Sequence, residues 1–361
     1  MPEMTSAESF EGTMDREIFE AGGRVYLLHH VLSAAAFRDE IDVFFDQFQD
    51  KLTCHLYAEE EGFEIGEDEL QSSYDMFRYE HSIFTVEDTL TWLSDRGMVD
   101  EDIVRYLERI HWHNRFATIL DDIRKAYIPQ RSSFAVNLWP ELILTGFLKS
   151  VSIPLAWRVV ASIKVTPDKI WTDRMRSTFH QKILSGTGSV DNWLKQHFCS
   201  REWLSELIEM EVCFRMISEK VLSHERCMKI WQDRKLDFVR FFIQRAIFAS
   251  SSEAKEVYQC VLQDGEAFET VIKRIGIQSE AKTYLFEDVP EKLCSRFLSA
   301  LPEDILIEEG EEGEYILYRI MKKFEPGLED PDVRARVESF LLYQEFEPLV
   351  ERGIRWLVPM E

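Results

Sequence analysis

Residues 237–250 read DFVRFFIQRAIFAS, and no other stretch of the sequence says as much about the fold. The short run of aromatic and aliphatic side chains, followed by serines, predicts a β-strand. Residues 251–276 continue as SSEAKEVYQCVLQDGEAFETVIKRIG, in which two amphipathic helices are separated at Asp264 and Gly265. A strand followed by a pair of helices predicts a small α/β domain.

The residues downstream complete this predicted domain. Residues 290–300 predict a short helix, and residues 305–307 and 315–321 predict a hairpin whose turn is the acidic EEGEEGE. Pro331 then opens a last helix at a tolerated first-turn position. We therefore expect a small α/β domain over residues 237–325, followed by a C-terminal helix and tail over 326–361.

Upstream, residues 15–123 predict a succession of amphipathic helices. Apolar side chains between Phe37 and Leu56 recur at steps of three and four, and Gly62 follows where a left-handed helix cap is favoured. Thr85 and Asp88 have the spacing of a capping box at the start of another helix. The N-terminal half therefore belongs to a helical domain.

Residues 126–190 are predicted to be less regular. They contain four prolines and a Gly-Thr-Gly-Ser stretch at 186–189, which is typical of a loop or linker. The helical domain, over residues 15–236, is thus expected either as one body or as two lobes that divide near 126–190. The chain as a whole is predicted to be α+β, with a mainly helical N-terminal domain.

Two segments of the helical domain resemble each other. TWLSDRGMVDEDIVRYLERI begins at Thr91 and NWLKQHFCSREWLSELIEME begins at Asn192. Both start with Trp-Leu, break briefly and continue as an amphipathic helix at the same offset, which indicates a short internal repeat.

The charge of the chain restricts its partners. Its 361 residues include 42 basic and 66 acidic side chains, which leaves a formal charge of −24. Such a charge repels nucleic acids and anionic membranes, so neither is expected as a partner. It favours basic peptides, although acidity of this size is also explained by solubility alone.

Localisation is predicted from what the sequence lacks. The N-terminal MPEMTSAESFEGTMDREIFE has neither the cationic start nor the apolar run of a signal peptide. Charged residues and prolines interrupt the most apolar region, residues 138–163, which is therefore expected to be buried core. The six cysteines form no CxxC pair, so we expect reduced thiols in a cytoplasmic protein.

The order of elements resembles the SurA and PrsA type of chaperone-foldase, in which a helical domain accompanies a parvulin-type prolyl isomerase domain. The resemblance is carried by residues 66–110 in the helical part and by 222–276, 289–301 and 313–342 in the second part. It rests on the pattern of elements more than on individual residues. It implies a peptide-binding cradle and a parvulin-like α/β domain.

The second domain departs from the parvulin pattern at the residues that matter for isomerisation. Where the family's first strand ends in an Arg-His-Ile-Leu-like motif, this chain has Arg245-Ala246-Ile247-Phe248, and GEYILYRI, starting at Gly313, lacks the expected histidine of the last strand. The glycine-rich loop is shortened to GIQSEAKTYLF. The resemblance therefore implies a pseudo-isomerase without catalytic residues, in which the peptide-facing candidates are Arg245, Ala246, Phe248, Tyr315 and Tyr318.

Other constellations give weak indications of chemistry. Two histidines in adjacent or alternate helix positions point apart, which disfavours a shared metal, and the remaining candidates fit core or solvated positions better. These candidates are His29 with His30, His111 with His113, the cysteines Cys199, Cys213 and Cys227, and the acidic runs Glu59–Glu61 and 308–314. No nucleophile elbow, phosphate loop or dinucleotide fingerprint is present, so we expect no metal and no cofactor.

Three functions are compatible with these residues. The first is a non-catalytic peptide-binding chaperone or accessory that holds an unfolded or precursor peptide during maturation or export of a ribosomally synthesised peptide, beside a modifying enzyme or a transporter. The second is an enzyme, either a residual prolyl isomerase or a peptide-modifying activity. The third is a structural subunit of a modifying enzyme.

Overall fold

The computed structural model describes residues 6–186, 188–310 and 313–360. The chain forms two compact units. Unit 1 comprises residues 1–218 and 345–361, and unit 2 comprises residues 219–344. The protein is α+β, as the sequence predicts. The division proposed from the sequence, at residues 236 and 325, stays a prediction.

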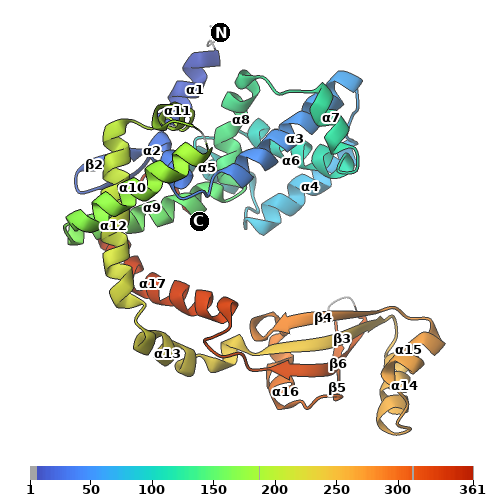
Figure 1. The fold of residues 1–361 in the computed structure, drawn as a ribbon. Coiled ribbons are helices and arrows are strands. Elements are labelled where there is room, and N and C mark those ends of the chain that lie inside the picture. Colours follow the sequence, from blue (N-terminus) through green and yellow to red (C-terminus); the bar gives the residue numbers. More distant parts are fainter. Residues whose placement is uncertain (1–5, 187, 311–312, 361) are drawn as a thin grey trace. The chain divides into compact units, whose positions relative to one another are not determined.

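Unit 1 is built mainly from helices (Figure 1). They are α1 (Ser6–Met14), α2 (Leu28–Phe37), α3 (Asp42–Glu61), α4 (Glu67–Glu80), α5 (Val86–Asp95), α6 (Asp100–Arg115), α7 (Leu120–Ala126), α8 (Arg131–Leu144), α9 (Phe147–Lys164), α10 (Lys169–Gly186), α11 (Val190–Gln196) and most of α12 (Arg201–Val221). The predicted signals for helix ends hold, because Gly62 takes the left-handed conformation after α3 and Thr85 closes a capping box with Asp88 at the start of α5.

Unit 1 also contains a small sheet that the sequence did not predict. Strands β1 (Glu17–Ala21) and β2 (Arg24–Leu27) form a hairpin, and β7 (Ile354–Trp356) pairs antiparallel with the other edge of β1. The prediction of helices throughout residues 15–123 is therefore wrong at this hairpin. The available signal is Gly22-Gly23, since a glycine pair between apolar runs favours a two-residue hairpin turn, and both residues have positive φ.

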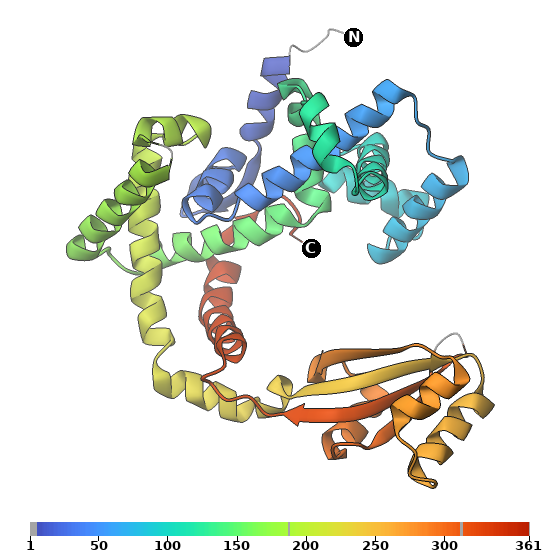
Figure 2. The same cartoon turned by 45° about the vertical axis from the view of Figure 1, so that its right-hand side comes forward.

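The core of unit 1 joins elements from α1 to α12, and its central helices include prolines. Pro140 lies inside α8 and Pro154 inside α9, so the irregular structure predicted for residues 126–190 is wrong. Apolar side chains of both helices, such as Leu142 and Leu155, are buried, and α2 lies against α9 (Figure 2). This burial outweighs the helix hydrogen bond that each proline omits, a loss of about 3 kcal/mol.

The two resembling segments fold alike. Helix α5 ends at Asp95 and α6 begins at Asp100, whereas α11 ends at Gln196 and α12 begins at Arg201. In both places a short helix ends in a tight turn and a longer helix follows after four residues. The internal repeat therefore exists as a structural unit as well as a sequence pattern.

Unit 2 contains a four-stranded antiparallel sheet in the order β4-β3-β6-β5 (Figure 1). Its strands are β3 (Arg240–Phe248), β4 (Ser279–Leu285), β5 (Ile305–Glu309) and β6 (Tyr315–Phe324). Its helical elements are α13 (His224–Asp233), α14 (Ser251–Leu262), α15 (Phe268–Ile275), α16 (Cys294–Ser299), the 3₁₀ turns Lys235–Phe238, Phe286–Asp288 and Glu291–Leu293, and the larger part of α17 (Pro331–Gly353). The predicted strand at 237–250, both following helices and the 305–321 hairpin are confirmed; residues 311 and 312 of its turn lie outside the described part.

Two apolar clusters hold this sheet. One packs β3 and β6 against α16 through side chains such as Phe241 and Phe297, and the other packs them against α14 and α15 through Phe248 and Phe268. The segment that was expected as a shortened loop, within residues 276–286, instead forms β4, which pairs along β3 from Ser279 to Leu285. Its mostly polar, exposed side chains hide the strand from a hydrophobicity pattern.

None of the described helices is by itself long and apolar enough to cross a membrane. One pair, Ser132–Leu144 and Phe147–Lys164, meets the length and composition criteria only when both are taken together across a bend of 74°.

Candidate functional site

The five peptide-facing candidates lie on adjacent strands of unit 2. Arg245 is the register partner of Tyr318, and Phe248 is the register partner of Tyr315. Ala246 and Phe248 are each only 1% exposed and Tyr318 only 3%. These three side chains fill the two cores of the sheet, so in this conformation they offer no surface to a peptide. Their role, and the loss of isomerase function, stay predictions.

Tyr318 belongs to a polar contact on the side of the sheet that α16 covers. Its hydroxyl donates to Glu308 Oε2 at 3.1 Å. Burial, together with the negative charge of Glu308, raises the pKa of Tyr318 above its ordinary value. Tyr318 therefore remains a protonated donor at any physiological pH, which suits a structural role in the sheet.

Two of the histidines singled out in the sequence make polar contacts within the protein. His111 Nδ1 lies 3.2 Å from Glu69, and the backbone N–H of Leu27 donates to His30 Nδ1 at 3.0 Å. Burial and the neighbouring His29 and Arg24 lower the pKa of His30 to about 3, which keeps this ring neutral. No metal-ligand grouping among the described residues includes any of these histidines.

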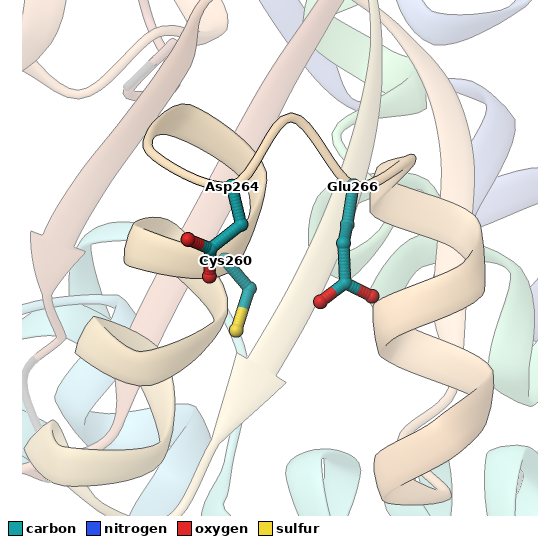
Figure 3. Close-up of side chains that lie close together, drawn as sticks. All are labelled: Cys260, Asp264 and Glu266. Carbon is teal, nitrogen blue, oxygen red and sulfur yellow. The ribbon is translucent and has the colours of Figure 1, made fainter.

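One group of possible metal ligands does come together, in unit 2 (Figure 3). The ligand atoms of Cys260, Asp264 and Glu266 lie within 4.8 Å of one another. Arg274 already pairs with Glu266 of this group, because its guanidinium donates to both Glu266 oxygens, at 2.7 and 3.2 Å, and contacts Cys260 Sγ at 3.8 Å. A cation would have to displace that guanidinium, so the geometry favours an internal ion pair.

A pocket in unit 1 is better suited to a ligand. Its volume is about 480 Å³, within the range of about 300–1,000 Å³ typical of ligand sites. Apolar side chains supply most of its lining, with four polar side chains around them. The lining residues are Phe10 and Met14 of α1, Leu32 of α2, Ile41, Asp42, Phe45 and Asp46 at the start of α3, Leu138 of α8, and Gln196, His197 and Phe198 at the end of α11.

Phe198 enters the pocket from an unusual backbone position. Its φ is +51°, and the N–H of Cys199 bonds to the carbonyl of Leu194 at 2.9 Å, which is the Schellman arrangement that ends a helix. In this arrangement the left-handed residue is usually glycine, because a side chain there costs about 1 kcal/mol or more. Among the described residues with positive φ, Phe198 is the one that is neither glycine nor polar.

The internal repeat shows what this position would otherwise hold. At the end of α5, Gly97 has a φ of +60° and Met98 N–H bonds to the carbonyl of Leu93 at 3.0 Å. This is the same turn as at Phe198, with glycine in the left-handed position. A phenylalanine where its counterpart is a glycine marks a site at which the side chain is retained despite its backbone cost.

The Phe198 ring forms one wall of the pocket. It lies 5.3 Å from the ring of Phe10, centroid to centroid, at an angle of 48°. It is nevertheless 46% exposed, so the aromatic pair offers one covered face and one open face. An apolar side chain that enters the pocket would cover the open face, which stabilises the complex by burial of apolar surface.

The rim of the pocket is acidic. Asp42 and Asp46 lie one helical turn apart in the first turns of α3 and are exposed. His197 beside them is partly buried, and this burial lowers its pKa although Asp42 acts in the opposite direction. The histidine is therefore neutral at physiological pH and does not cancel the two carboxylates. The site combines an apolar interior with a negative edge.

Sequence reasoning found the repeat but missed the pocket. Aligning the two segments places Phe198 opposite Gly97, and this pairing was the signal that could have located the site. The other lining residues come from five helices, and their meeting depends on packing that no local pattern indicates.

Comparisons with known proteins give only weak structural likenesses. No family model matches the chain, and no curated protein matches it. The chain is similar to the solved structure of the foldase protein PrsA from Streptococcus pneumoniae, with 14% identity, 58% of this chain and 81% of that chain covered, and a TM-score of 0.25. It is also similar to the structure of PrsA from Bacillus subtilis, with 15% identity, 60% of this chain and 84% of that chain covered, and a TM-score of 0.21. A structure from work on the SurA-like chaperones PEB4 and Cj1289 of Campylobacter jejuni is similar too, with 12% identity, 61% of this chain and 88% of that chain covered, and a TM-score of 0.18. TM-scores this low carry no argument about function.

Proposed function

We propose that this chain is a non-catalytic peptide-binding protein that holds an unfolded or precursor peptide by an apolar side chain placed in the unit 1 pocket. The observation that carries the proposal is Phe198, an aromatic residue kept in a left-handed position where its repeat counterpart is Gly97. Most of the lining is apolar, and this surface supports the binding of an apolar side chain.

The acidic rim narrows the class of peptide. Asp42 and Asp46 attract a lysine or arginine next to the inserted side chain, and the chain's charge of −24 attracts basic peptides over longer distances. The preferred ligand is therefore an extended segment with one large apolar residue beside a cationic one. A precursor peptide on its way to maturation or export in the cytoplasm, handed to a modifying enzyme or transporter, is the form of this ligand that we propose.

A binding titration tests the proposal. A fluorescent peptide with phenylalanine flanked by lysines is added to the protein, and anisotropy is followed at 0.1 M and 1 M salt, where the Debye length falls from about 10 Å to about 3 Å. We expect a dissociation constant in the micromolar range or below, weaker at 1 M salt. Phe198→Gly should weaken binding at least about tenfold, because the removed ring forms a wall of the site.

Ile170→Ala is the matched control, since Ile170 is an exposed apolar residue on α10 outside the pocket. Equal binding by the wild type and Phe198→Gly would contradict the proposed site. Acceleration of proline isomerisation would favour a residual isomerase. Stoichiometric co-purification with an enzyme, without affinity for peptide, would favour a structural subunit.

A further inference from the structure

A second surface of unit 1 exposes apolar side chains outside the pocket. A short turn joins helices α4 and α5, and five large apolar residues on these helices and in the turn are between 61% and 75% exposed. They are Met76 and Tyr79 on α4, Phe84 in the turn, and Val86 and Leu90 on α5. We call these five residues the hairpin surface. Isolated exposed apolar residues are common, but five of them within residues 76–90 indicate an interaction site.

The hairpin surface is held in place before any partner binds. The rings of Tyr79 and Phe84 lie 6.3 Å apart, and Arg78 donates to the Phe84 carbonyl at 3.0 Å. On the inner side, Phe77 packs edge-on against Trp92 at 5.7 Å. A surface fixed in this way loses little conformational entropy on binding.

The surroundings of the hairpin surface are strongly acidic. Residues 59–102 contain fifteen acidic and two basic side chains, so this segment contributes −13 to the chain's charge of −24. Both basic residues are engaged within this segment: Arg96 is buried over the Trp92 ring, and Arg78 bonds to the turn.

Acids also alternate with the apolar residues along the chain. Asp75 precedes Met76, Glu80 follows Tyr79 and Glu87 follows Val86, and none of the described cations forms an ion pair with these three acids. The exposed face therefore presents apolar groups set among unneutralised carboxylates.

We propose that the hairpin surface docks a cationic amphipathic helix of a partner protein. The apolar side chains match the apolar stripe of such a helix, and the carboxylates match lysines and arginines at its edges. Charge decides against the other occupants. A second copy of this chain would bring two negative surfaces together, and anionic lipid is repelled in the same way. The proposal goes beyond the peptide pocket and does not depend on it.

The test uses a synthetic helix of about 18 residues, five helical turns, with leucines on one face and lysines on the other. Anisotropy with the full-length protein should give saturable binding that weakens with salt, and a leucine–glutamate helix of the same pattern should not bind. The triple variant Tyr79→Ser, Phe84→Ser, Leu90→Ser should lose at least about tenfold in affinity. Asp75→Asn, Glu80→Gln, Glu87→Gln together should weaken binding and flatten its salt dependence.

Ile170→Ser controls for loss of an exposed apolar side chain elsewhere in unit 1 and should bind as the wild type does. Phe198→Gly should also bind the helix normally, which separates this surface from the pocket. Unchanged affinity in the triple variant would overturn the proposal. So would a wild-type dimer in light scattering that the triple variant dissociates, because the surface would then be a contact between copies of this chain.

Discussion

Phe198 and Gly97 occupy equivalent left-handed positions, which strain the backbone of phenylalanine but not that of glycine. Gly97 has the conformational freedom that the position requires, and a Cβ there would lie 2.8 Å from Arg16 Nη1. Phe198 is strained by the left-handed conformation, and its ring lines the pocket. The same turn is therefore unstrained at Gly97, whereas at Phe198 it is strained and supplies a wall of the pocket.

Substitution at Phe198 separates these effects. Phe198→Ala and Phe198→Gly both remove the ring, but only glycine relieves the left-handed strain, so the glycine variant should have the higher unfolding free energy, by about 1 kcal/mol. Urea unfolding of both variants measures this difference, and peptide titration should show the same loss in both. A more stable alanine variant would show that position 198 is not strained.

Gly97 gives the complementary prediction. Gly97→Ala should lower the unfolding free energy by about 1 kcal/mol or more, because the new Cβ is both strained and close to the Arg16 guanidinium. Peptide binding should be unchanged, since Gly97 does not line the pocket. A variant as stable as the wild type would contradict the equivalence of the two turns.

His30 makes the stability of unit 1 dependent on pH. Its folded pKa of about 3 lies below the ordinary value of about 6.5, so the unfolded chain takes up this proton first. The stabilisation from the neutral ring is complete above about pH 6.5 and is lost as the pH falls toward 3. The pKa values of His55, His81 and His197 are also lowered, and they contribute with the same sign.

We expect the unfolding free energy to decrease between pH 7 and pH 5, above the range where carboxylates titrate. His30→Gln should reduce this slope in urea denaturation, and the exposed His180→Gln should not. An identical slope in all three proteins would mean that His30 takes up its proton over the same pH range in the folded and the unfolded chain.

At the scale of elements, a capping box formed by Thr85 and Asp88 begins α5, the helix that carries two residues of the hairpin surface. The Asp88 N–H donates to Thr85 Oγ1, and the Thr85 N–H donates to Asp88 Oδ2, both at 3.0 Å. Thr85→Ala should therefore cost about 1 kcal/mol of unfolding free energy, while Thr85→Ser, which keeps the acceptor oxygen, should cost little. Chemical denaturation compares the two, and equal losses would place the effect in the methyl group instead of the cap.

The elements that the sequence predicts well are those with local causes. Thr85, Asp88 and Gly62 act on residues within one helical turn, and their caps are confirmed. Strand β4 was missed because its partner β3 supplies the stabilisation, and α8 and α9 were missed because distant packing overrides their prolines. The pocket forms where five helices meet, which no local pattern predicts. Among its lining residues, only Phe198 could have been noticed in the sequence, because the repeat aligns it with Gly97.

At the scale of the whole molecule, unit 1 is discontinuous in sequence. Unit 2 is inserted between Ser218 on α12 and Glu345 on α17, and within unit 1 these two helices meet where the rings of Phe214 and Phe346 lie 5.0 Å apart. The ends left by removing unit 2 therefore belong to helices that are already packed together.

Replacing residues 219–344 with a short Gly-Ser linker should leave unit 1 folded, with the wild-type affinity for the pocket peptide. Circular dichroism and anisotropy check the two parts of this prediction. Removing residues 354–361 instead should destabilise unit 1, because β1 loses its pairing with β7. An unfolded excision variant would show that unit 1 needs unit 2 to fold.

The pairing of β1 with β7 also sets an order of events at the ribosome. Strand β1 leaves the ribosome early, but its partner is translated only after every residue of unit 2. The nascent chain thus carries an incomplete unit 1, with the edge of β1 open, for as long as unit 2 is being made. Unit 1, with its pocket, can therefore complete its folding only after unit 2 has been translated.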